Sequence, residues 1–200
     1  MDLSALHLFV LGYAPGVPGF VIDRALLACA RDVARDTGMM RTNHVLSFAA
    51  GQSDVVVSAV ADTTPHRLGY AVVGGRPLHL VSGLFFVQER SGTPTQAELA
   101  SGSVRVYPTP TEAVSVKVEI QRVPSADAKT LPDEFADRYR DCLAHGALAY
   151  LLMQQGTPWY DPAKAETHRG EYRRLLGEAR FDKVAGANGR ANHVVIPPVI

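Results

Sequence analysis

The chain has 200 residues, of which 20 are Lys or Arg and 20 are Asp or Glu, so its formal net charge is zero. This length suits one domain, or one domain with a sizeable insertion, and the 46% content of hydrophobic residues excludes a wholly disordered chain. Zero net charge argues against a protein whose main task is to grip nucleic acid, because that task needs an excess of Lys and Arg.

The cysteines and the N-terminal sequence indicate in which cellular compartment the protein is made. Cys29 and Cys142 are the two cysteines, and no CxxC motif occurs, so we expect buried free thiols rather than a disulfide framework. The chain starts Met1-Asp2-Leu3 without the basic region of a secretion signal. No segment approaches the roughly 18 apolar residues of a membrane span. We therefore expect a protein made in a cytoplasm, with no membrane partner.

The first predicted element is a helix over residues 19–37. Apolar residues recur at helical spacing on one side of it, and charged residues occupy the other side. Pro18 lies at the start of the helix, where proline is tolerated, and Gly38 is a suitable stop. The apolar positions are Ile22, Leu26, Cys29 and Val33.

The middle stretch, residues 43–123, is predicted to be β structure. Apolar residues alternate with polar ones from Val114 to Ile120, a period of two that a helix cannot use. Pro108–Glu112 is expected to link the last two strands as a hairpin loop, and Gly74-Gly75 to form another hairpin. The polar segment Ser91–Gly102 is expected to be a loop. The other strand candidates are Val45–Ala49, Val55–Val60, Tyr70–Val73, Leu78–Val81, Leu84–Gln88 and Val104–Val106.

The third stretch is predicted to contain two helices. The first begins at Leu131-Pro132-Asp133-Glu134, with Thr130 as a possible cap. Gly146 lies inside this helix at a cost of about 1 kcal/mol relative to Ala, which a close helix–helix approach would explain. The segment Gln155–Tyr160 ends it. Asp161-Pro162 then starts a second helix, with Asp as N-cap and Pro in the first turn, that continues to about residue 184.

The C-terminal tail, Gly186 to Ile200, resembles neither the helical stretches nor the β stretch. It begins with loop-forming residues and ends in an apolar segment whose double proline excludes a helix. This segment has no evident way to bury its own apolar face, so we expect it to need a partner. Packing on its own subunit is the alternative. Its residues are Val194, Val195, Ile196, Pro197, Pro198, Val199 and Ile200.

The order of these elements predicts an α+β fold. Because the helix at 19–37 is short for stability in water alone, we expect it to form a small bundle with the two C-terminal helices. Residues 1–42 and 124–185 then form a helical core, residues 43–123 an inserted antiparallel β domain, and residues 186–200 an extended tail.

Catalytic and metal-binding motifs are missing from the sequence. It contains no GxSxG, Walker, HExxH or GxGxxG pattern, and its seven histidines are scattered. His145 is expected to lie on the surface, or to have partners for its hydrogen-bonding nitrogens if it is buried. His168 and Glu171 could share a metal, but two ligands without a third make a poor site. We therefore expect neither catalysis nor a cofactor.

Two groups of residues are candidate contact sites. Arg169, Arg173, Arg174 and Arg180 form a basic stripe on the last helix. The stripe could contact phosphates, but glutamates interleave with it, which favours ion pairs on a solvated face. Trp159 and Tyr160 could form a stacking platform, although an aromatic plug between helices is more common. Together with Gly146 and Tyr172, they are candidates for packing between helices or between subunits.

Motifs in the terminal parts resemble those of tailed-phage head–tail adaptor proteins. Leu131–Glu134, Gly146–Leu152 and Pro158–Pro162 resemble, in this order, the family's LPD start, GAL helix and PW turn. Pro18–Arg41 resembles its first helix, with Met39-Met40 in place of the usual aromatic residue before Arg41. The β stretch is similar only in type, and is most like that of adaptors from short-tailed phages.

This resemblance implies a structural virion protein at the neck of the particle. Such adaptors form a ring, typically of twelve copies, that binds the portal ring above and the tail tube or nozzle protein below. Genomic DNA passes through the ring without specific binding. The apolar tail would then dock on the portal or on a neighbouring subunit, by strand addition or by filling a pocket.

Three other interpretations remain open. The chain could be another neck or tail-completion protein. It could be a ligand-binding β module with a helical oligomerisation unit, in which Tyr70, Phe85, Phe86 and Tyr107 line a pocket, although core positions are more usual for such residues. It could also be an enzyme with a site assembled from distant residues, but no carboxylate pair or metal set supports that reading.

Overall fold

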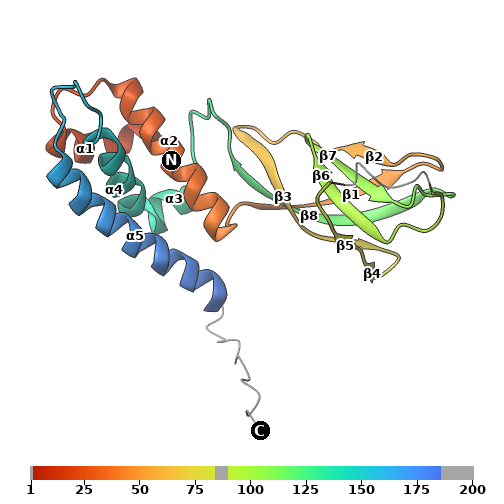
Figure 1. Cartoon of the computed structure of the whole chain (residues 1–200). Helices are drawn as coiled ribbons and strands as arrows, with labels where there is room; N and C mark the ends of the chain where they lie inside the picture. Colours follow the sequence, from red (N-terminus) through yellow and green to blue (C-terminus); the bar gives the residue numbers. More distant parts are fainter. Residues whose placement is uncertain (1, 84–89, 186–200) are drawn as a thin grey trace, which may run out of the picture. The chain divides into compact units, whose positions relative to one another are not determined.

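The computed structural model describes residues 2–83 and 90–185. The chain divides into two compact units (Figure 1). One is formed by the N-terminal part up to Thr37 together with the part that begins at Lys129, and the other by Gly38–Ala128. One unit is helical and the other contains two β sheets, so the mixed α+β class predicted from the sequence is confirmed.

The helical unit contains one 3-10 helix and five α-helices in the described residues. The predicted helix at 19–37 is confirmed as α2. The predicted helix from Asp133 is divided at Tyr139, whose φ of −122° and ψ of 8° are not helical. The elements are η1 (Leu3–Leu6), α1 (His7–Tyr13), α2 (Gly19–Thr37), α3 (Asp133–Arg138), α4 (Arg140–Leu151) and α5 (Pro162–Ala185).

The ends of these helices agree with the sequence in part. Helix α5 begins as predicted, because the backbone N–H of Lys164 donates to Asp161 Oδ1 at 3.1 Å. The predicted cap at Thr130 is wrong, since Pro132 occupies the N-cap position of α3 and no side chain caps the helix there. Helix α1 was not predicted, because seven residues with a single buried position, Val10, show too little periodicity.

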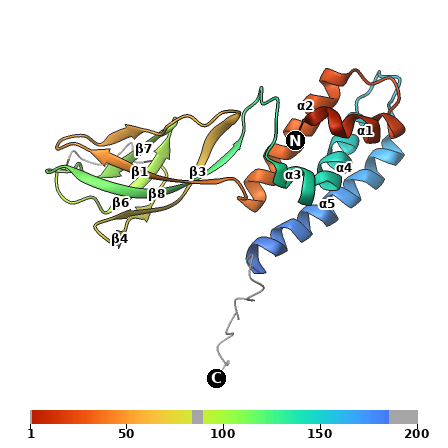
Figure 2. The same cartoon turned by 180° about the vertical axis from the view of Figure 1, so that it is seen from behind.

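Helix α4 lies at the centre of the helical unit. It packs against α2 on one side and α5 on the other, and the two views agree on this arrangement (Figures 1 and 2). Its residues are apolar almost all round, as a fully covered helix requires. The buried ones include Leu143, Ala144, Ala147, Leu148 and Leu151.

The β unit contains eight strands in the described residues, and they form two sheets. One has the order β1-β8-β3-β4 and is antiparallel. The other has the order β2-β7-β6-β5, in which only β5 and β6 are parallel. The strands are β1 (Arg41–Phe48), β2 (Asp54–Val56), β3 (Thr63–Val73), β4 (Arg76–Pro77), β5 (His79–Leu80), β6 (Gln96–Ala100), β7 (Ser103–Tyr107) and β8 (Val114–Pro124).

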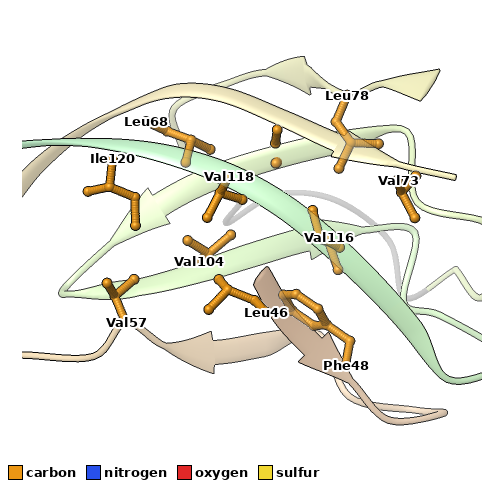
Figure 3. Close-up of a cluster of buried hydrophobic side chains, with 13 residues drawn as sticks. Leu46, Phe48, Val57, Leu68, Val73, Leu78, Val104, Val116, Val118 and Ile120 are labelled. Carbon is orange, nitrogen blue, oxygen red and sulfur yellow. The ribbon is translucent and has the colours of Figure 1, made fainter. Parts of the chain in front are cut away.

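The core of the β unit lies between the two sheets. Figure 3 shows side chains of β1, β3 and β8 meeting Val104 of β7 and Val57. The period-two pattern of β8 explains its place at the centre of its sheet, because Val116, Val118 and Ile120 all point into this core and are fully buried. The arrangement is that of two sheets packed face to face.

Two predicted loops of the β unit are wrong. Pro108–Glu112 does not join a hairpin, because β7 and β8 belong to different sheets and the segment crosses between them, beginning at a cis peptide bond between Tyr107 and Pro108. Ser91–Gly102 is not a loop throughout, since it contains β6, which pairs with β7. Its polar composition hid the strand, although Ala97 is fully buried.

The other strand predictions were confirmed in part. The hairpin at Gly74-Gly75 is confirmed, because β3 pairs with β4 around these two glycines, both with positive φ. The strand expected at Val55–Val60 is shorter, since β2 ends at Val56. The strand expected at Leu84–Gln88 lies outside the described residues.

Replacement of Ile120 by Ala is expected to lower the free energy of unfolding by about 2–5 kcal/mol, because the side chain is fully buried between the sheets and its loss leaves a cavity. Urea unfolding followed by circular dichroism measures this change. Val45→Ala on β1 is the control, since this side chain is 65% exposed and its loss leaves no cavity. Equal effects of the two substitutions would contradict the sandwich core.

Candidate functional site

Gly146 occupies the point where three helices of the helical unit meet. A Cβ atom at this position would lie 2.8 Å from Cys29 Sγ of α2 and 2.9 Å from two ring carbons of Tyr172 of α5. These distances are shorter than real Cβ contacts. This is the close helix–helix approach that a glycine inside a helix predicts.

A shallow groove of about 370 Å³ runs over this meeting point. Its lining includes the small residues Ala25, Ala28 and Ala149. Tyr150, which is 62% exposed, also lines the groove, as do the charged residues Asp32 and Arg173. The groove therefore combines small apolar, aromatic and charged side chains on the surface of the helical unit.

The basic stripe of α5 is largely ion-paired. Arg169 lies 2.8 Å from the Glu166 carboxylate. Arg174 pairs with both Glu171 and Glu178, and Arg180 pairs with Asp36 of α2. Of the four arginines, only Arg173 has no ion pair among the side chains that the structure describes. The geometry thus fits the ion-pair interpretation of the stripe, in which exposed pairs contribute little stability each.

Trp159 and Tyr160 lie in the connection between α4 and α5. This connection is held by the N–H of Asp161, which donates to the carbonyl of Leu152 at 2.9 Å, and by the hydroxyl of Thr157, which donates to the carbonyl of Gln154 at 2.7 Å. Trp159 is half-buried, and its buried indole N–H has no acceptor within the part of the chain that the structure describes. Tyr160 is 42% exposed.

His145 and His168 are brought together by the same helical hairpin. Their Nδ1 atoms lie 2.8 Å apart. His168 is buried, and burial together with the neighbouring His145 lowers its pKa. The sequence pattern places the two residues on separate helices and predicts no contact between them. Their positions offered a signal, because they lie eleven residues on either side of Gly156-Thr157 in the turn between two antiparallel helices.

Glu171 does not complete a metal site with these histidines. Its carboxylate is bound by Arg174, and the guanidinium lowers its pKa. Among the described residues, no group of three or more His, Cys, Asp or Glu side chains is arranged to hold a metal ion. None of the helices in the same residues is long and apolar enough to cross a membrane.

The remaining candidate residues are distributed between the β unit and the tail. Tyr70 is exposed on β3, where its hydroxyl donates to Asn43 Oδ1 at 3.2 Å, and Tyr107 lies on β7 in the other sheet. A hollow of about 940 Å³ beside the Gly74-Gly75 hairpin is lined by neither tyrosine. Phe85, Phe86 and the tail from Val194 to Ile200 lie outside the described residues.

Similarity to known proteins shows the family of this chain. A family model described as the SU10 adaptor protein matches residues 5–195, which include nearly all of both units. The chain therefore belongs to the SU10 adaptor protein family. It is a structural protein of the bacteriophage virion, a head–tail adaptor, and its family is not one of enzymes. No curated protein matches the chain.

Replacement of Gly146 by Ala is expected to destabilise the helical unit by about 1–3 kcal/mol, because overpacking outweighs the gain in helix propensity. The new methyl group would press on Cys29 Sγ and on the ring of Tyr172. Thermal unfolding followed by the fluorescence of Trp159, the only tryptophan, measures the effect.

Gly177→Ala in α5 is the matched control, since a Cβ atom at that position meets nothing within 4 Å. This variant should be as stable as the wild type, or more stable by up to about 1 kcal/mol, because Ala is the better helix former. If Gly146→Ala were stabilising to the same degree, the close approach of the three helices would be refuted.

The thiols of Cys29 and Cys142 are expected to be inert in the native protein. Both are buried and free, and desolvation raises the pKa of each to about 12, so almost no thiolate is present at pH 8. A colorimetric disulfide reagent should modify neither thiol in buffer and both in urea. Rapid reaction of one thiol in buffer would show that its helix contacts open readily.

Proposed function

We propose that this chain is a ring-forming head–tail adaptor, with twelve copies joining the portal ring to the tail tube or nozzle and enclosing the channel through which DNA leaves. The observation that carries the proposal is the family match over residues 5–195, because it includes nearly all of both units. The resemblance of the β stretch to short-tailed-phage adaptors extends the proposal to a particle of that type.

Exposed apolar side chains of the helical unit support a role in assembly. Leu8, Phe20 and Tyr150 are each more than 60% exposed, and burying such residues against a partner is favourable by roughly 1.5–3 kcal/mol each. A ring built from identical chains needs two different faces on every subunit. The groove over Gly146, which Tyr172 helps to line, provides one candidate face. Trp159 and Tyr160, in the connection between α4 and α5, are proposed as further contact residues.

The charge distribution suits a channel that DNA crosses without stopping. The net charge is zero, and three of the four arginines in the α5 stripe are engaged by carboxylates. Arg173 is the position at which a phosphate could be met. Such a surface attracts the DNA backbone weakly, and the salt-dependent grip of a dedicated DNA-binding protein is not expected from it.

The tail is proposed to be the segment that engages the portal or the neighbouring adaptor. Its apolar residues, Val194 to Ile200, carry two prolines and therefore suit extended docking in a pocket or along a sheet edge. In this proposal the β unit is an insertion into the helical adaptor core, and the core forms the wall of the ring at the virion neck. No cofactor takes part.

Mixing the chain with the portal ring from the same genome tests this function. Full-length protein is expected to join the portal in one large species whose mass, measured by light scattering after size exclusion, exceeds that of the portal by twelve chains. A chain ending at Gly186 is expected to remain separate, because it lacks the tail.

A matched control keeps the length of the tail constant. Replacing Val194, Ile196 and Ile200 by Ser should weaken binding, whereas replacing Ala187, Asn188 and Ala191 by Ser should not. A stable dimer that ignores the portal would overturn the adaptor assignment in favour of a ligand-binding module. Binding of the full-length chain to the tail protein alone would indicate another neck component.

A further inference from the structure

The short helix α1 is attached to the helical hairpin through two histidines. The ring of Phe9 meets His145 edge-on with centroids 5.7 Å apart, and the ring of Tyr13 meets His168 edge-on at 4.9 Å. The two imidazoles in turn contact each other through Nδ1 atoms 2.8 Å apart. The aromatic side of α1 therefore rests on a pair of titratable rings.

A contact of this length between two imidazole nitrogens needs one donor and one acceptor. The pair satisfies this requirement when both rings are neutral, and also when it carries one positive charge. It cannot do so when both rings are protonated, because two N–H donors and two positive charges would then face each other. The number of protons on the pair is thus linked to the placement of the two rings, against which Phe9 and Tyr13 of α1 pack.

The surroundings compensate a second positive charge only in part. The hollow beside the pair is lined by Tyr13 of α1 and by Lys164, Thr167 and Glu171 of α5, and no residue of α2 or α3 lines it. Lys164 adds positive charge and is paired with Asp161. Glu171 faces His145, but its carboxylate is held by Arg174. His7, at the other end of α1, pairs with Asp23 of α2 instead.

We propose that the His145–His168 pair is a proton-sensitive latch that holds α1 on the α4–α5 hairpin at neutral pH and releases it when both rings are protonated. Release would expose Val10, the fully buried residue of α1. The proposal concerns the isolated chain, so it can stand or fall independently of ring assembly.

The direction of the pH effect follows from burial. Desolvation, and next the charge of His145, lower the pKa of His168 below its usual 6.5. A group whose pKa is lowered on folding stabilises the folded form above the unfolded pKa, and this stabilisation is lost as the pH falls through the folded pKa. Docking of α1 should therefore be complete above about pH 6.5 and weaken in more acidic buffer.

Hydrogen exchange of the α1 amides between pH 7.5 and 5, expressed as protection factors that remove the intrinsic pH dependence, tests the latch in the full-length chain. The second protonation occurs at a lower pH in the docked pair than in the released pair. Between these two pH values, protection of α1 is expected to fall about tenfold per pH unit. The uptake of the second proton by the pair, followed by NMR through its imidazole resonances, should have the same midpoint as this loss of protection.

His168→Asn and His145→Asn are the informative variants, because asparagine places an uncharged amide near the position of Nδ1. In either variant the doubly charged state cannot form, so protection of α1 should no longer depend on pH. His44→Gln in the β unit is the control and should behave like the wild type, since its ring nitrogen bonds only to Thr42.

The wild-type measurement decides the matter even if a variant fails to fold. Independent titration of the two histidines near pH 6.5, with α1 equally protected throughout, would overturn the latch. Loss of protection in the β unit at the same midpoint would overturn it as well, because the cause would then be general acid unfolding.

Discussion

The burial of α4 is the constraint on which the helical unit depends. This helix is apolar on nearly every side, so it must be covered on nearly every side. The cover comes from α2, at the start of the chain, and from α5, near its end. Gly146 makes this arrangement possible, because any side chain there would push away Cys29 of α2 and Tyr172 of α5 at once.

The β unit is stabilised separately by its own core between two sheets. The thirteen buried side chains of this core all come from residues 46–120, so the unit does not borrow its apolar interior from the helices. A chain with two cores of this kind can present different surfaces to different neighbours. That property agrees with the structural role of the SU10 adaptor family, in which a chain has to link parts of a virion.

The contacts made by the candidate site residues were only partly recognisable from sequence. The interleaved glutamates correctly predicted ion pairs for the α5 arginines, because residues three or four apart meet on a helix. The pairing of Arg180 with Asp36 was not foreseen, since the two residues lie far apart in sequence. The His145–His168 contact was also missed, because residues in an antiparallel helical hairpin meet according to the position of the turn.

The sequence by itself determined the type and approximate extent of the long elements, α2, α5 and β8, and the need for a close approach at Gly146. These properties depend on the spacing of neighbouring residues, which is written in the chain. Only the tertiary structure decided that β7 and β8 lie in different sheets, that β6 exists within a polar segment, and that a helix breaks at Tyr139. Such features depend on which segments, far apart in sequence, pack against each other. The local spacing of apolar residues does not specify that packing.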